Sequence, residues 1–318
     1  MKTNTLKNIS DKMRKYEDYT PAQPRNSDLP PCYNICLSAS PKGGGKTYNC
    51  ILLLQAYEKS GFVATDGTDV RMRIIWVAGG TSRSKQNNIL NTLDTLHDDD
   101  RIDMETDIDN KLTELYAGLL KERDEIEAYM VYIKTYKKFM KNTSSLNYEE
   151  LLLLQFKKYV NPKDDGDRPM DSEGNVLENP RMVFLVLDDM ISGDAFSATK
   201  RSNFLNRLSV KSRHESNLLV GINLFFITQS FKSIPAIIRR QTDIFILLKS
   251  ASQSYIIDAI SEETGSHFSK EELEMLYKEI MKVPYGALIL SIHKKEKEEN
   301  RVRLGWDKSI VRDPKYII

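Results

Sequence analysis

Five consecutive residues, Gly43-Gly44-Gly45-Lys46-Thr47, have the types and the order of a phosphate-binding loop. They lie between an apolar strand pattern at residues 33–37 and a helical pattern at residues 49–59. Glycines let backbone N–H groups approach phosphates closely, the lysine meets the β- and γ-phosphates, and the threonine hydroxyl binds Mg²⁺. Ser40 stands where such loops usually have their first glycine. We predict that a nucleotide binds along Ser40, Pro41, Lys42, Gly43, Gly44, Gly45, Lys46, Thr47 and Tyr48.

Two adjacent carboxylates, Asp188 and Asp189, follow the apolar run of residues 182–187. An unbroken apolar run of this length suits a strand that is buried on both faces of a parallel sheet. Asp188 is placed to bind Mg²⁺, and Asp189 points to the other side, where it would act as the general base for the attacking water. An acid directly after the metal-binding aspartate favours hydrolases of the additional-strand type over small kinases and GTPases.

Gln229 ends another apolar run, at residues 224–229. In such a sheet, a polar residue at this strand tip lies between the phosphate loop and the metal-binding strand. Its amide would form a hydrogen bond with the γ-phosphate or with the attacking water, and so would report the state of the nucleotide.

In this order, the loop, Asp188-Asp189, Arg213-His214, Gln229 and the segment 234–239 resemble the FtsK–HerA superfamily. The chain is most similar to the poxvirus-type genome-packaging ATPases of large DNA viruses, virophages and polinton-like elements. The resemblance covers roughly residues 33–250 and is weakest over 81–180. It implies a ring of subunits that hydrolyses ATP with Mg²⁺ and drives double-stranded DNA, independently of its sequence, into a preformed capsid. It also implies a capsid or portal-like vertex as partner, no membrane, and a location in the virion or viral factory.

Ring ATPases of this kind usually take an arginine from the neighbouring subunit, and such an arginine accelerates hydrolysis by about 10³–10⁵. The resemblance makes Arg213 and Arg239 the candidates, with Arg240 behind them. Asp189 stands where many ring ATPases have glutamate. Basic residues that would contact DNA are Lys200, Arg201, Arg207, Lys211, Lys232, Lys294, Lys295 and Lys297.

The elements that must position these residues alternate between strand and helix. Strand patterns at residues 33–37, 74–78, 182–187, 224–229 and 244–248 are separated by helical patterns, which predicts an α/β fold. We expect an additional-strand (RecA-like) P-loop ATPase core with a mainly parallel sheet in the order 5-1-4-3-2. Residues 287–293 and 301–306 predict a C-terminal β-hairpin.

The domain organisation follows from shifts in composition. Residues 1–31 form a polar arm, and residues 32–318 form a single P-loop ATPase domain. Within it, residues 106–160 are an inserted helical hairpin, and residues 161–180 are an exposed acidic loop. Leu112, Leu115, Leu119, Ile126, Tyr129, Ile133, Tyr136 and Met140 share one apolar stripe, which predicts a helix of about 30 residues and about 45 Å. The sequence leaves two interpretations of this hairpin: an ordinary pair of core helices, or a lever or oligomerisation arm.

Charge and cysteine content exclude several classes. The 318 residues include 46 Lys and Arg against 45 Asp and Glu, so the net charge of +1 is no argument for nucleic acid and any basic surface must be local. No apolar run suits a membrane span, and no apolar segment near the start suits a secretory signal. Three cysteines indicate a reducing compartment rather than a disulfide scaffold. Cys32 and Cys36 could be half of a metal site, but core packing suits them better.

Three other functions are compatible with these motifs. A DNA-processing helicase-translocase of the same superfamily would work with a nuclease instead of a capsid. A nucleotide-binding scaffold would bind DNA or capsid and hydrolyse ATP poorly. A small-molecule P-loop kinase is disfavoured by the Asp188-Asp189 pair and by Gln229.

Overall fold

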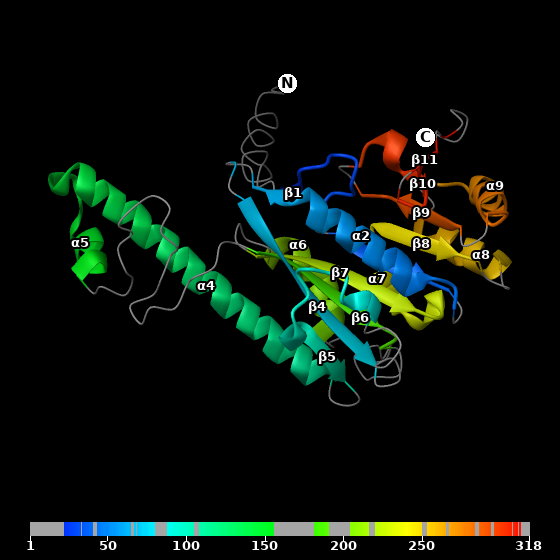
Figure 1. Ribbon diagram of the computed structural model, residues 1–318, viewed down its shortest axis with the longest axis horizontal. Helices are drawn as coiled ribbons and strands as arrows, with labels where there is room; N and C mark the ends of the chain where they lie inside the picture. Colours follow the sequence, from blue (N-terminus) through cyan, green and yellow to red (C-terminus); the bar gives the residue numbers. More distant parts are fainter. Residues whose placement is uncertain are drawn as a thin grey trace, which may run out of the picture.

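The computed structural model describes residues 22–32, 34–40, 43–64, 67, 69–79, 88–104, 108–155, 181–190, 204–215, 220–249, 253–264, 267–283, 286–293, 296–306, 308–310 and 312. Its described strands form one sheet of 11 strands with helices on both faces (Figure 1). The chain is therefore an α/β protein, as its alternating patterns predict. The acidic loop expected at residues 161–180 lies outside the described residues.

Five parallel strands make the centre of the sheet. They are β2 (Ile35–Ala39), β4 (Asp69–Gly79), β6 (Arg181–Asp188), β7 (Val220–Thr228) and β8 (Ile244–Leu248). Their order across the sheet is β4-β6-β7-β2-β8, and every neighbouring pair is parallel. Counted along the chain, this is the order 5-1-4-3-2. Because all five run the same way, their carboxyl ends lie along one edge of the sheet.

Shorter strands extend the sheet on both sides. Beyond β4 lie β3 (Phe62–Val63) and β1 (Gln23–Pro24), both antiparallel, while β5 (Arg101–Met104) pairs with β4 in parallel. Beyond β8 lie β9 (Ala287–Ser291), β10 (Val302–Leu304) and β11 (Lys308–Ser309), all antiparallel. The pairing of β9 with β10 is the C-terminal hairpin that the sequence predicts.

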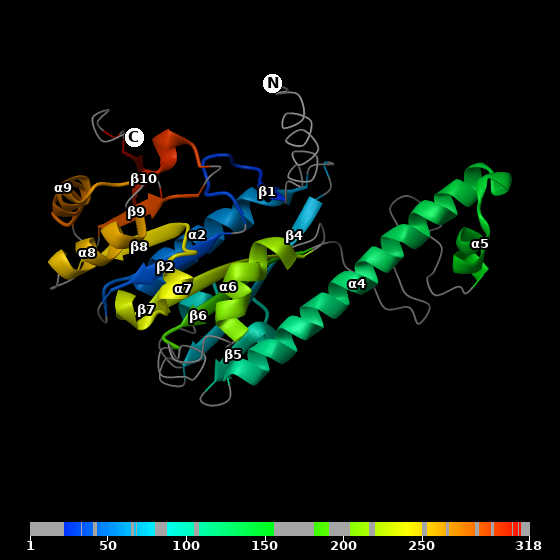
Figure 2. The same cartoon turned by 180° about the vertical axis from the view of Figure 1, so that it is seen from behind.

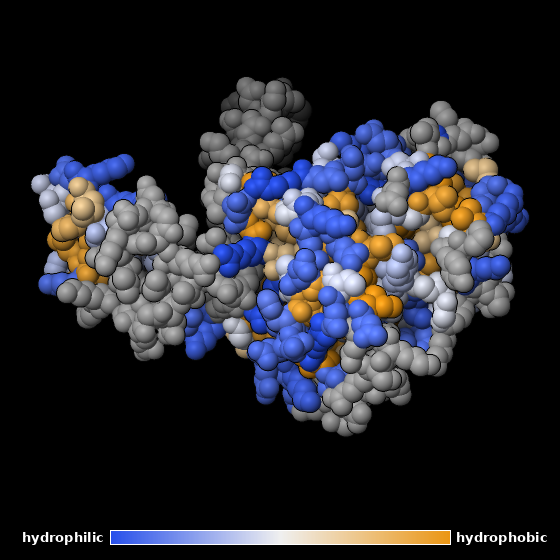
Figure 3. Space-filling view, in the orientation of Figure 1, coloured by the Kyte–Doolittle hydropathy of each residue, from blue (hydrophilic) through white to orange (hydrophobic). Residues whose placement is uncertain are grey.

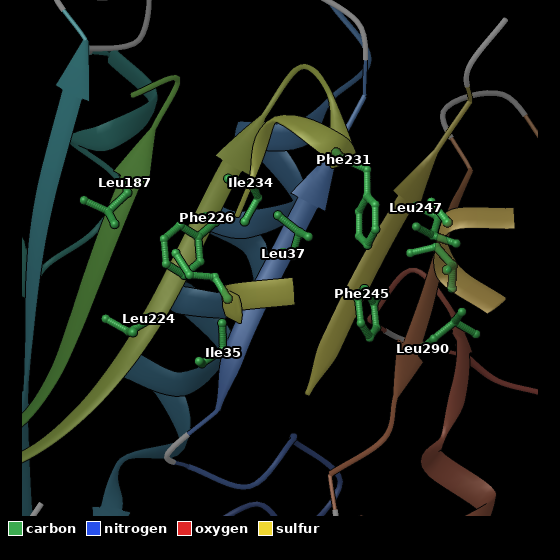
Figure 4. Close-up of a cluster of buried hydrophobic side chains, with 14 of the residues drawn as sticks. Ile35, Leu37, Leu187, Leu224, Phe226, Phe231, Ile234, Phe245, Leu247 and Leu290 are labelled. Atoms are coloured by element: carbon green, nitrogen blue, oxygen red, sulfur yellow. The ribbon is translucent and has the colours of Figure 1, made fainter. Parts of the chain in front are cut away.

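Alternate residues of the central strands feed two separate cores. Helix α2 (Lys46–Ser60) covers one face, and α6 (Phe204–Glu215), α7 (Ala236–Arg239), α8 (Gln253–Thr264) and α9 (Lys270–Ile280) cover the other (Figures 1 and 2). On β2, Leu37 packs in the core on the side of α6 to α9 (Figure 4), and its neighbour Cys36 packs in the core on the side of α2. Cys32, Cys36 and Cys50 are buried free thiols, and burial raises the pKa of each.

Helix α4 (Ile108–Lys141) is 34 residues long, hence about 50 Å, and extends away from the sheet (Figure 1). Its first turns pack on the core through the buried Leu112 and Leu119. The Asp109 carboxylate accepts a hydrogen bond of 2.7 Å from the backbone N–H of Phe204, at the start of α6. The sheet end of α4 is therefore anchored in the domain.

At its far end, α4 packs against the short helix α5 (Tyr148–Gln155). Tyr129 and Tyr132 are buried there in a small cluster, and the Lys138 ammonium donates to the Glu150 carboxylate at 2.7 and 2.9 Å. Met140, expected on the apolar stripe, is 66% exposed. Figure 3 shows hydrophobic surface over α5 at this end. No helix among the described residues combines the length and the apolar character that crossing a membrane requires.

Two segments that look polar in sequence pack on the domain. Residues 98–104, four of which are aspartates, form a short 3-10 helix and strand β5, and the Arg73 guanidinium holds the Asp100 carboxylate at 2.9 to 3.3 Å. Within residues 22–32, Ala22 and Leu29 are buried, and the Tyr57 hydroxyl donates to the carbonyl of Pro30 at 2.8 Å.

Candidate nucleotide-binding site

The glycine loop lies at the carboxyl end of β2, between that strand and the start of α2. Ser40 is buried, and its backbone N–H donates to the carbonyl of Thr228 on the neighbouring strand at 3.2 Å. Gly43 and Gly45 have φ values of 80° and 88°, which are readily available only to glycine. Open space surrounds the position where a Gly43 Cβ would be. This backbone leaves room for phosphates at the start of a 15-residue helix. Pro41 and Lys42 lie outside the described residues.

Lys46 is the first residue of α2, and its side chain folds back over the loop. Its Nζ donates to the carbonyl of Ser40 at 2.9 Å, and the residue is buried. Burial lowers the pKa of Lys46, while the charges of Asp189 and Asp188 act in the opposite direction. The ammonium is therefore within electrostatic reach of both carboxylates. Gly44 and Thr47 are half-buried, and Tyr48 is 56% exposed.

Asp188 and Asp189 stand at the carboxyl end of β6. Asp188 is buried as the last residue of the strand. Asp189 turns away with a φ of 52°, a left-handed conformation that is unfavourable for a residue with a Cβ. Its N–H donates to the carbonyl of Ile227 at 3.0 Å, which holds this turn against β7.

The close approach of β4 to this turn depends on Gly79. A Cβ on Gly79 would lie 3.0 Å from the backbone oxygen of Asp189, closer than side chains normally come. The sequence identifies Gly79 only as a strand end. The Asp189 carbonyl becomes its neighbour only through the pairing of β4 with β6, which the sequence does not display.

Gln229 reaches Asp189 from the end of β7. Its Nε2 donates to Oδ2 of Asp189 at 3.1 Å. The other oxygen, Oδ1, is buried and accepts no hydrogen bond within the part of the chain that the structure describes. A buried carboxylate oxygen in this condition is suited to a bound water or ion. Thr47 and Asp188 offer oxygen donors, the kind that Mg²⁺ prefers.

The candidate arginines lie in different environments. Arg239 donates through Nε to Glu263 at 3.1 Å and through Nη1 to the carbonyl of Ile234 at 2.8 Å. Its side chain is only 16% exposed, and its Nε and Nη1 donors are used within the chain. Arg240, next to it, is exposed. Arg213 lies on α6, where its side chain is outside the described residues.

Of the residues singled out in the sequence, the structure thus brings together Lys46, Asp188, Asp189 and Gln229. Asp188, Asp189 and Gln229 lie at the ends of β6 and β7, and Lys46 begins α2 after the loop that follows the adjacent strand β2. Arg239 is the one whose surroundings differ most from the expectation, because its ion pair with Glu263 lies within the chain.

Comparisons with known proteins give limited similarities. No protein-family profile and no curated protein sequence matches the chain. Among solved structures, the genome packaging NTPase B204 from Sulfolobus turreted icosahedral virus 2, in complex with AMPPCP, is 12% identical with a TM-score of 0.41, covering 88% of this chain and 98% of its own. The pCW3 conjugation coupling protein TcpA, monomer form with ATPgS, is 14% identical with a TM-score of 0.41, over 89% and 61%. EccC (ATPases 2 and 3) of Thermomonospora curvata is 14% identical with a TM-score of 0.35, over 70% and 32%. Because these TM-scores are low, no role is transferred from these proteins to this chain.

Proposed function

We propose that this chain is a Mg²⁺-dependent ATP hydrolase. The observation that carries the proposal is the meeting of the Lys46 ammonium, the Asp188-Asp189 pair and the Gln229 amide beside a glycine loop at one sheet edge. A positive charge, two carboxylates and a hydrogen-bond donor in this arrangement suit phosphoryl transfer to water, where catalysis is mostly positioning and charge stabilisation.

The loop and Lys46 bind the triphosphate. Lys46 exchanges its bond to the Ser40 carbonyl for the phosphate oxygens, and the left-handed glycines expose backbone N–H groups to them. Thr47 and Asp188 would hold Mg²⁺, which would neutralise phosphate charge.

Asp189 and Gln229 handle the attacking water. Oδ1 of Asp189 accepts a proton from the water while the water oxygen forms a bond to the γ-phosphorus. ADP leaves with the electrons of the broken P–O bond. Gln229 bonds Oδ2 of the same carboxylate, so it fixes which oxygen is available. Movement of Gln229 toward the γ-phosphate would release Asp189 and couple nucleotide state to β7.

We also propose that hydrolysis drives double-stranded DNA into a viral capsid through a ring of identical subunits. Support comes from the sequence resemblance described above, and the capsid or portal-like vertex, the absence of a membrane role and the virion or viral-factory location come with it. Of the basic candidates described, Arg207, Lys232 and Lys297 are exposed. They would contact phosphates without regard to sequence. Arg240, which is exposed, and Arg213, which the resemblance indicates, are our candidates for an arginine that reaches a neighbouring subunit.

The test measures phosphate release from ATP by the purified protein, with and without long double-stranded DNA. Lys46→Ala is expected to abolish turnover. Lys59→Ala, which removes an equal charge from an exposed position of the same helix, is expected to leave it unchanged. DNA stimulation that responds to capsids supports packaging, and stimulation by a nuclease instead supports the helicase-translocase. ATP binding without turnover under conditions where a ring forms would refute the motor and favour the scaffold.

A further inference from the structure

The turn after β10 leaves the sheet on the same edge as the glycine loop. The strand register places Ala39, Leu247, Leu288 and Leu304 in one row across β2, β8, β9 and β10. Ser40 follows the first of these residues, and Gly305 follows the last. Although 265 positions separate Ser40 and Gly305 in the chain, they leave the sheet together, about 14 Å apart at the spacing of three strand pairs.

This turn then reaches the helix behind the glycine loop. Gly305 has a φ of 60°, and its N–H donates to the carbonyl of Ala287 at 2.9 Å. Trp306 follows, and its indole Nε1 donates to the backbone carbonyl of Asn49 at 2.9 Å. Asn49 in turn donates to the carbonyl of Gly45 through both its backbone N–H and its Nδ2, each at 3.0 Å. One intermediate residue therefore connects the Trp306 ring to the last glycine of the loop.

A second aromatic ring occupies the same turn of α2. Tyr48 precedes Asn49, follows Thr47, and is 56% exposed. Trp306 is half-buried, with part of its ring against the core on the α2 face. The first turn of α2 thus has an open aromatic ring on it and another held beside it by a hydrogen bond.

A nucleotide bound at the loop extends beyond the loop. The backbone N–H groups and Lys46 engage phosphates only, so the ribose and base lie outside the loop, and the first turn of α2 is a surface that adjoins it. Aromatic faces bind bases by stacking, and a ring whose orientation is already fixed loses little freedom on doing so.

We propose that Tyr48 and Trp306 form the nucleobase-binding part of the site, an inference that rests on the proposed nucleotide binding. The C-terminal hairpin β9–β10 thereby becomes a wall of the nucleotide site. Trp306 is oriented by its bond to Asn49, and Tyr48 supplies the open face.

The test compares Mg²⁺-ATP with Mg²⁺-tripolyphosphate, which lacks ribose and base, by calorimetry. Tyr48→Ala and Trp306→Ala are expected to weaken ATP binding by about 5- to 100-fold, as loss of base stacking does, and to leave tripolyphosphate binding within about twofold. Trp306→Phe keeps a ring and gives a smaller loss. Tyr148→Ala removes an exposed tyrosine on the distant α5 and serves as the matched control.

Fluorescence gives an independent readout, because the chain has two tryptophans and the other, Trp76, is buried in β4. ATP is expected to change the emission of the wild type and not that of Trp306→Phe, and tripolyphosphate is expected to change neither. The inference is overturned if Tyr48→Ala weakens ATP and tripolyphosphate equally, or if ATP binds no more tightly than tripolyphosphate. Failure of the wild type to bind either compound would overturn the proposed hydrolase as well. Tyr48→Ala alters an exposed residue, so the test does not depend on the folding of Trp306→Ala.

Discussion

Asp189 offers a direct measurement of strain at the site. Of the residues that the structure describes, it is the one non-glycine with a positive φ, at 52°. A Cβ in this region costs about 1 kcal/mol or more, because it approaches the following carbonyl oxygen. Asp189→Ala keeps that Cβ, and Asp189→Gly removes it, while both variants lose the carboxylate and its bond to Gln229. The difference between the two variants therefore combines the relief of backbone strain with the greater freedom of glycine in the unfolded chain, and a second position is needed to separate the two.

We expect Asp189→Gly to have a free energy of unfolding about 1 kcal/mol higher than Asp189→Ala. With about 2.1 cal/mol/K of unfolding entropy per residue, a chain of 318 residues has about 0.7 kcal/mol/K, so the Tm values should differ by about 1.5 °C. Urea unfolding followed by tryptophan fluorescence measures the same difference. Both variants should bind ATP and fail to hydrolyse it.

The matched control is Ser230, an exposed neighbour with a φ of −136°. There, Ser230→Gly should be less stable than Ser230→Ala by about 0.5–1 kcal/mol, because glycine has more freedom in the unfolded chain. A stability difference between Asp189→Gly and Asp189→Ala equal to that between Ser230→Gly and Ser230→Ala would refute the assignment of strain. A hydrolytically active Asp189→Ala would refute the assignment of the general base.

Three further changes test the surroundings of the site. Gly79→Ala places a Cβ 3.0 Å from the Asp189 carbonyl and should lower kcat about tenfold while the affinity for ATP stays the same, as steady-state kinetics and calorimetry would show. Arg239→Ala should lower the free energy of unfolding by about 3 kcal/mol, because it leaves a partner carboxylate buried, whereas Arg240→Ala should change it by less than about 0.5 kcal/mol in urea titrations. Burial lowers the pKa of Lys46 from the value of about 10.4 of an ordinary lysine. Its ammonium therefore loses its proton at a lower pH than an ordinary lysine does, and a calorimetric pH series should show ATP affinity falling at that lower pH.

Each of these expectations has a clear contrary result. A Gly79→Ala enzyme with wild-type kcat would show that the approach of β4 does not position Asp189. An Arg239→Ala protein with wild-type stability would return Arg239 to the candidates for a neighbouring subunit. For Lys46, the control is Lys46→Arg, whose charge persists to higher pH, and an identical pH profile in the two proteins would exclude Lys46 as the titrating group.

The central sheet and the residues at its edge could be predicted because each of the polar motifs comes directly after an apolar strand pattern. Asp188-Asp189 and Gln229 each end an uninterrupted apolar run, and the glycine loop follows another. Parallel strands bring their carboxyl ends to one edge, so sequence order alone placed these groups near one another.

Other features depend on pairings between residues that lie far apart along the chain. The three aspartates at 98–100 form a 3-10 helix just before β5, and Asp100 is held by Arg73 of β4, which lies 27 residues earlier in the chain. Arg239 looks available in sequence because its partner, Glu263, lies 24 residues later on another helix. The role of Gly79 depends on a backbone oxygen rather than on a side chain, so no residue type signals it.

Helix α4 combines two levels of local stability in one continuous element. Its sheet end shares the main core through Leu112 and Leu119, whereas the burial that the described residues give its far end comes from the small cluster around Tyr129 and Tyr132. Amide hydrogen exchange should therefore be slow over the first turns and become faster toward residue 141, because opening the last turns exposes little apolar surface. We therefore expect the far end to open locally at a lower free energy than the nucleotide site, so that the two ends of one helix respond separately to denaturant.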